Sequence, residues 1–105
     1  MEIEWESEKD RRIVFELAKK DPVTARRMER IAAAITFLDL VPGANGRAHF
    51  LDRDYVGYFA LDLSTKLNPA RLICIPTGDY QKNGNLYKKE TITSFKIVKI
   101  EKNYH

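Results

Sequence analysis

The chain of 105 residues contains few of the residues that build disulfides and metal sites, with one cysteine, Cys74, and two histidines, His49 and His105. A single cysteine excludes an internal disulfide and favours a reducing compartment. Two histidines and one cysteine are too few for a zinc site of the usual ligand count, and the acidic residues show no ligand-like cluster. We therefore expect no metal and no other cofactor. Cys74 lies within an apolar run, as a small core residue does.

Other functional signatures are missing as well. The sequence has no glycine-rich phosphate loop and no serine in a nucleophile-elbow context. It has no apolar run long enough to cross a membrane and no basic-then-apolar leader. The composition is 44% hydrophobic and 31% charged, and the formal net charge is +3. These features predict one soluble domain spanning residues 1–105, located in the cytoplasm, whose basic charge is compatible with a nucleic-acid partner without being specific for one.

The N-terminal part predicts a short strand and two helices. Residues 1–5 alternate between apolar and acidic side chains from residue 2 on, as a short strand does. Ser7 begins a helical pattern that continues to Lys20, and Asp21 with Pro22 is typical of the cap and first turn of a second helix. We expect the two helices to form an antiparallel hairpin. The apolar stripe of the second helix, which we expect to lie in the core, consists of Met28, Ile31, Ala32, Ile35 and Leu38.

The remainder of the chain predicts a sheet. Proline and glycine residues within 41–46 end the helical part. The expected strands cover roughly residues 47–51, 56–63, 71–76 and 91–101, and the last has apolar residues on both faces, which is typical of an interior strand. The polar segment Thr77–Lys89 is expected to be an exposed, mobile hairpin connection. The predicted fold class is α+β: a short N-terminal strand, a two-helix hairpin and a mainly antiparallel twisted sheet.

The histidines and arginines of this sheet suit a phosphodiester. His49 lies in the first expected sheet strand, Arg71 opens the third, and Asn103-Tyr104-His105 follow the last. An imidazole can take a proton from a ribose 2′-hydroxyl or give one to a departing 5′-oxygen near neutral pH. A guanidinium offers fixed donors to the phosphate, and tyrosine can stack on an unpaired base. Together they form the inventory of a metal-free ribonuclease.

Each of these residues also has a structural interpretation. His49 alone is more often a satisfied structural residue, and a terminal Asn-Tyr-His is more often a frayed tail. The arginines can be solvated charges or ion-pair partners. Asp52 and Asp54 would partly neutralise a basic patch near Arg53.

Four motifs occur in a fixed order along the second half: R-x-H-x-L from Arg47, G-Y-F-A-L-D-L from Gly57, N-P-A-R-L-I from Asn68, and I-x-x-I-x-x-N-Y-H from Ile97 to His105. In this order they resemble the HigB branch of the RelE/ParE superfamily of bacterial toxins, over the span from Arg47 to His105 with gaps. The resemblance implies a RelE-like, microbial ribonuclease-type fold. It also implies the toxin of a type II toxin–antitoxin system, an mRNA interferase that enters the ribosomal A site, contacts 16S ribosomal RNA and cuts mRNA, and is neutralised by a helix-turn-helix, HigA-like antitoxin.

The resemblance also assigns roles to individual residues. Asn103 stands where the family usually has aspartate, and Asp52-Arg53 replaces the usual lysine-glycine, so Arg53 is expected to supply that charge. The candidate catalytic residues are His49, Arg71, Tyr104 and His105, and the candidate RNA-binding residues are Arg47, Arg53, Asn103 and Tyr58.

Two other functions stay open. A ParE-like member of the same superfamily would inhibit DNA gyrase by binding alone. A basic RNA- or DNA-binding module without catalysis would use Tyr55, Tyr58 and Phe59 as stacking platforms.

Overall fold

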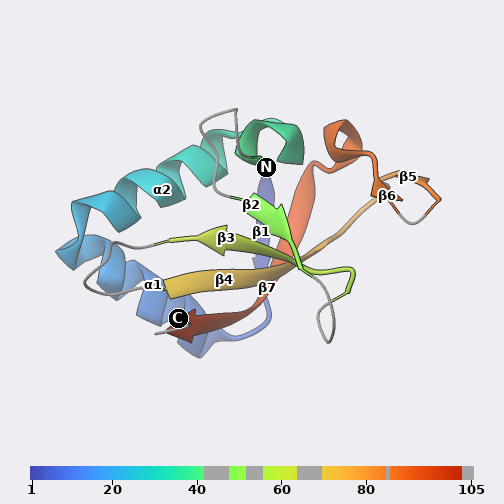
Figure 1. The fold of residues 1–105 in the computed structure, drawn as a ribbon. Coiled ribbons are helices and arrows are strands. Elements are labelled where there is room, and N and C mark those ends of the chain that lie inside the picture. The colour runs from blue at the N-terminus through green and yellow to red at the C-terminus, as the bar shows by residue number, and fades with distance from the viewer. Residues whose placement is uncertain (42–47, 52–55, 64–69, 85, 103–105) are drawn as a thin grey trace.

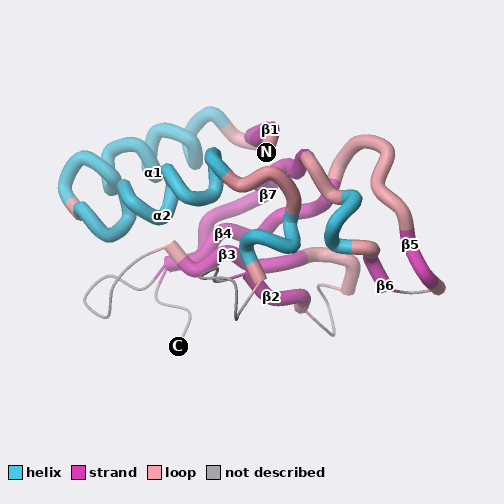
Figure 2. The backbone as a smooth tube through the Cα atoms, turned by 90° about the horizontal axis from the view of Figure 1, so that it is seen from above, coloured by secondary structure: helices cyan, strands magenta, loops and turns pink. Residues whose placement is uncertain are grey.

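The structure is a computed structural model that describes residues 1–41, 48–51, 56–63, 70–84 and 86–102, leaving out the side chains of His49 and Lys102. Two helices lie side by side over one face of a twisted sheet (Figures 1 and 2). The elements in chain order are β1 (Glu2–Trp5), α1 (Glu8–Lys20), α2 (Pro22–Ala33), a 3₁₀-helix (Phe37–Leu40), β2 (Ala48–Phe50), β3 (Phe59–Asp62), β4 (Ala70–Pro76), β5 (Lys82–Asn83), β6 (Leu86–Tyr87), a second 3₁₀-helix (Lys89–Thr91) and β7 (Ser94–Lys102). The α+β class and the order of its parts are as the sequence predicts.

The main sheet has the strand order β1-β7-β4-β3-β2. Strand β1 runs parallel to β7, and the other neighbouring pairs are antiparallel. The prediction of an interior last strand is confirmed, because β7 lies between β1 and β4. Strands β5 and β6 form a separate two-stranded hairpin inside the segment expected to be a hairpin connection.

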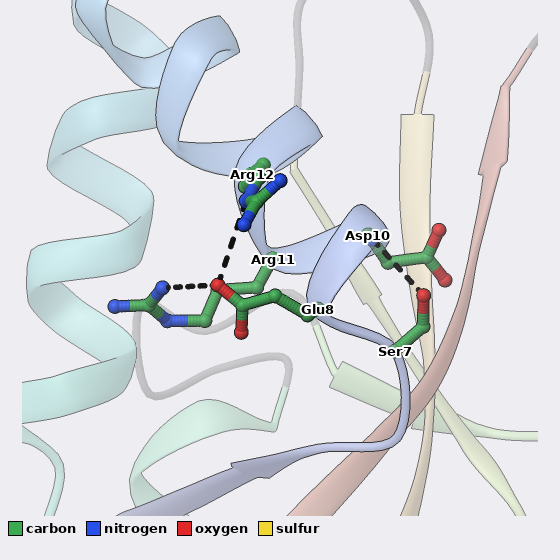
Figure 3. A network of polar contacts seen from close by, with 5 residues as sticks. All are labelled: Ser7, Glu8, Asp10, Arg11 and Arg12. Atoms are coloured by element: carbon green, nitrogen blue, oxygen red, sulfur yellow. Dashed lines mark hydrogen bonds and ion pairs between the residues drawn. The ribbon is translucent and has the colours of Figure 1, made fainter.

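Both helices begin where the sequence predicts. The Ser7 hydroxyl accepts a hydrogen bond from the Asp10 amide at 3.2 Å, and the Glu8 carboxylate of the same turn pairs with Arg11 and Arg12 (Figure 3). The Asp21 carboxylate accepts from the backbone amide two residues on, which caps α2. Side-chain acceptors of this kind satisfy amides that have no partner within the helix.

The predicted apolar stripe of the second helix is wrong at Ala32, Ile35 and Leu38. Helix α2 ends at Ala33 because Ala34 is extended, with φ −63° and ψ 142°, and the chain turns into the first 3₁₀-helix. The Asp39 carboxylate accepts from the amides of Ile35 and Thr36, which stabilises this new turn. As a result Ile35 is 77% exposed, and Leu38, which was also expected in the core, is exposed as well. Ala32 was expected in the core too, but it lies on an exposed side of α2 itself.

The hydrophobic core lies between the helices and the sheet. Val14 of α1 and Ile31 of α2 contribute to it from the helix layer, and the first 3₁₀-helix contributes Phe37. Phe59 packs edge-on against Phe37, with ring centroids 4.5 Å apart. Cys74 is also fully buried there, as expected, and burial raises the pKa of its thiol. None of the helices in the described ranges has the length and apolar character needed to cross a membrane.

Candidate active site

The candidate site lies on the sheet face opposite the helices. Leu61 and Leu72 belong to the core beneath α1 and α2, whereas their neighbours Ala60 and Ile73 are fully buried but lie outside that core cluster. Since successive residues of a strand point to opposite faces, Ala60 and Ile73 belong to the second face. Arg71, two residues before Ile73, shares this face. Neither α1 nor α2 covers it (Figure 2).

Arg71 sits in the middle of a polar row. Its strand neighbours in register are Asp62 on β3 and Glu101 on β7. The guanidinium Nε of Arg71 donates to Oε1 of Glu101 at 2.6 Å, and both side chains are only 21% exposed. The Lys99 ammonium lies 3.4 Å from the other oxygen of Glu101. The row therefore combines the cations of Arg71 and Lys99 with the carboxylates of Asp62 and Glu101, and Glu101 contacts both cations.

The pKa of Glu101 reflects this arrangement. Burial by itself would raise the pKa, but the hydrogen bond and charge of Arg71, together with the charge of Lys99, outweigh burial and lower the pKa below its ordinary value of 4.5. The carboxylate is therefore ionised at neutral pH and holds Nε of Arg71 toward β7. A phosphate that binds Arg71 has to compete with this carboxylate.

His49 lies two strands away from Arg71. Its backbone in β2 pairs with Ala60, which in turn pairs with Ile73 on β4. Two strand spacings and two residues along β4 separate the Cα atoms of His49 and Arg71 by about 12 Å. The strand of His49 and the strand of Arg71 thus lie on either side of β3.

The end of β7 lies further off. Lys102 of β7 pairs with Ala70 of β4, and β7 is three strand positions away from β2. Ala70 also precedes Ile73, the β4 residue in line with His49, by three residues. The Cα atoms of Lys102 and His49 are therefore roughly 17 Å apart. Three further residues span at most about 10 Å of backbone. Convergence of the two imidazoles would require the chain to turn back across β4 and both side chains to reach over β3.

The other predicted residues divide into two groups. Tyr58 is half-buried beside β2, and its carbonyl accepts from the Leu51 amide at 3.1 Å. It precedes Asp62 by four residues, so its Cα is about 13 Å from the Arg71 row. The predictions for Arg47, Arg53, Asn103, Tyr104 and His105 lie outside the described residues.

Sequence reasoning missed the carboxylate partner of Arg71. Glu101 is an acidic residue directly after Ile100, in a strand whose other charged residues are lysines, and that change of sign was the available signal. In the part of the chain that the structure describes, no three histidine, cysteine or acidic side chains gather as a metal-binding group. Comparison with protein-family models, with curated proteins and with solved structures gives no match.

Proposed function

We propose that this chain is a HigB-like toxin with a RelE-like fold that cuts translated mRNA on the ribosome as an endoribonuclease. The observation that carries the proposal is the spacing of β2 and β4, which sets the Cα atoms of His49 and Arg71 about 12 Å apart. The row of Arg71 lies on the sheet face that α1 and α2 leave uncovered. The motif order from Arg47 to His105 supports the same proposal. Under it the chain works in the cytoplasm and is held inactive by a helix-turn-helix antitoxin.

The proposed chemistry needs no metal. One histidine, His49 or His105, takes the proton of a ribose 2′-hydroxyl as its oxygen attacks the adjacent phosphorus. The bond from phosphorus to the 5′-oxygen then breaks, and that oxygen takes a proton from the other histidine or from Tyr104. The products are a 2′,3′-cyclic phosphate and a 5′-hydroxyl.

Arg71 would stabilise the charge that builds on the phosphate. In the resting protein its Nε is bound to the single negative charge of Glu101. The phosphorane formed during attack carries more negative charge than the starting phosphodiester, so it competes better for the guanidinium than the substrate does. Arg47 and Arg53 are the proposed additional phosphate contacts, and Asn103 and Tyr58 are proposed to contact the RNA.

A translation reaction with purified bacterial ribosomes tests the proposal. A defined mRNA is added with the wild-type chain, and the new 5′ ends are mapped by primer extension. We expect cuts that require ribosomes, and a loss of rate of about 10²–10⁴-fold in His49→Ala and His105→Ala. Glu16→Gln, an exposed substitution on α1, is the matched control and should cut at the wild-type rate. An mRNA left intact by the wild-type chain would refute the proposal.

A second candidate is a ParE-like inhibitor of DNA gyrase that acts by binding alone. The Arg71–Glu101 ion pair favours it, because a guanidinium already bound to a carboxylate attracts phosphate less strongly. A supercoiling assay with purified gyrase separates the two functions. Inhibition of supercoiling together with intact mRNA would support this candidate over the nuclease.

A further inference from the structure

The β5–β6 hairpin and the end of β2 form an aromatic surface that the proposed nuclease chemistry does not use. The rings of Phe50 and Tyr87 are stacked, with centroids 5.3 Å apart and planes inclined by 21°. Tyr80 packs edge-on against Tyr87 at 5.3 Å. Phe50 is 37% exposed although its ring also touches the core residue Phe37. We call Phe50, Tyr80 and Tyr87 with the lysines Lys82 and Lys89 the hairpin platform.

Two lysines of the platform lie over its rings. The ammonium of Lys82 is 4.9 Å from the centroid of Tyr87, and that of Lys89 is 5.9 Å from the centroid of Phe50. Lys88 is exposed beside them, and Asp79 and Glu90 are the carboxylates of the same segment. Three lysines against two carboxylates leave a small positive excess, and the cations rather than the carboxylates are the groups in contact with the rings.

The platform is held in place before any ligand arrives. The Tyr87 hydroxyl donates to the Gly57 carbonyl at 2.9 Å, which ties β6 to the turn before β3. Gly57 has φ +90°, a conformation that favours glycine. Burial first, and then the neighbouring Tyr80, raise the pKa of Tyr87, so its hydroxyl keeps its proton at neutral pH and can donate this bond. The Lys88 amide donates to the Gln81 carbonyl across the hairpin.

We propose that the hairpin platform binds single-stranded RNA, with a base stacked on the Phe50–Tyr87 pair and the adjacent phosphates on Lys82 and Lys89. Stacking between a base and an aromatic ring is stronger than a cation–π contact at an exposed site, so a base can displace an ammonium group from a ring. The displaced ammonium then pairs with a phosphate of the same strand. A duplex, whose bases are stacked and paired, offers no free base face to this surface.

The position of the platform relates it to the proposed function, on which this inference rests. Phe50 follows His49 directly on β2, but successive residues of a strand point to opposite faces, and the Phe50 ring packs against the core residues Phe37 and Phe59. RNA bound on the platform would therefore pass around the edge strand β2 to reach the face of the candidate site. Figure 1 shows β5 and β6 at the opposite end of the molecule from the turn between α1 and α2. The platform would therefore hold the mRNA on one side of the scissile bond, and the segment Thr77–Lys89 would be part of the substrate-binding surface.

The test measures binding separately from cleavage. A fluorescein-labelled single-stranded RNA with 2′-O-methyl groups, which block attack by the 2′-oxygen, is titrated with the full chain and followed by anisotropy at several salt concentrations. We expect the double variant Lys82→Gln/Lys89→Gln to bind roughly 10-fold more weakly and to lower the salt slope by about 1.4. Phe50→Leu, checked for folding by its thermal transition, should bind about 5-fold more weakly.

The matched control is Lys9→Gln/Lys20→Gln, which makes the same change in net charge on α1. It should bind within 2-fold of wild type. Equal losses in the two double variants, unchanged affinity in the platform variants, or no binding by the wild-type chain would each overturn the inference. If the platform variants lose affinity while the wild-type chain cuts no mRNA on ribosomes, the platform stands and the nuclease proposal fails. If the wild-type chain cuts mRNA on ribosomes and the platform variants bind RNA with wild-type affinity, the nuclease proposal stands and the platform inference fails.

Discussion

The ion pair between Arg71 and Glu101 joins residues 30 positions apart in the sequence. It lies in a row of the sheet that starts at Asp62 and ends beside Lys99. Because both partners are only 21% exposed, water screens this pair less than it screens the exposed pairs of α1. The pair therefore stabilises the packing of β4 on β7 and also sets the orientation of the candidate catalytic arginine.

Replacing Glu101 by glutamine tests this role. We expect Glu101→Gln to lower the free energy of unfolding by about 1 kcal/mol at pH 7. The pKa of Glu101 is lowered in the folded state, so its stabilisation is present above the unfolded pKa and is lost as the pH falls through the folded pKa. The difference between wild type and variant should therefore shrink below about pH 4.5. Urea unfolding at a series of pH values measures it.

The exposed substitution Glu90→Gln is the control for that series and should change stability by less than about 0.5 kcal/mol at pH 7. A Glu101→Gln deficit that stays constant from pH 7 down to pH 3 would contradict an ionic origin.

At the scale of elements, α2 shows where a local pattern stops being reliable. The apolar spacing continues from Met28 to Leu38, but the helix ends at Ala33 and the chain turns into the first 3₁₀-helix. Ile31 is 5% exposed and Ile35 is 77% exposed, although both belong to the same predicted stripe. Two identical side chains four positions apart thus have opposite environments.

This difference makes a matched experiment. We expect Ile31→Ala to cost about 2–5 kcal/mol of unfolding free energy, because it empties a core position. Ile35→Ala should cost less than about 0.5 kcal/mol. Chemical unfolding of both variants measures the two values. Similar losses in the two would show that α2 continues to Leu38 in solution, as the periodicity alone predicts.

The same comparison shows what the sequence can predict. Helix starts depend on side chains within three residues, and the caps at Ser7 and Asp21 are where the sequence puts them. The end of α2 depends on acceptors such as Asp39, and the pairing of Arg71 with Glu101 depends on strand register, which local spacing does not determine. The sequence therefore predicts Arg71 as a site residue without predicting its partner. The stacking of Phe50 on Tyr87, which are far apart in the sequence, likewise could not be predicted from local spacing.

At the scale of the whole molecule, the strand order decides which candidate residues can meet. Strand β3 separates the strand of His49 from the strand of Arg71, while β7 brings Lys102 beside Ala70. Under the proposed function, one phosphodiester would span the strands of His49 and Arg71, and the terminal Asn103-Tyr104-His105 would have to cross the sheet to join them. The hairpin platform begins one residue after His49, at Phe50, but on the opposite face of the edge strand β2.

The direct test of the account is the chemistry of the cut on the ribosome. An mRNA with a single 2′-deoxyribose on the 5′ side of the mapped cleavage point is translated beside its all-ribose counterpart in the presence of the chain. We predict that the all-ribose mRNA is cut to a 2′,3′-cyclic phosphate and a 5′-hydroxyl and that the deoxy-substituted mRNA stays intact at that point. Equal cleavage of the two messages, or cleavage of neither, would contradict the account.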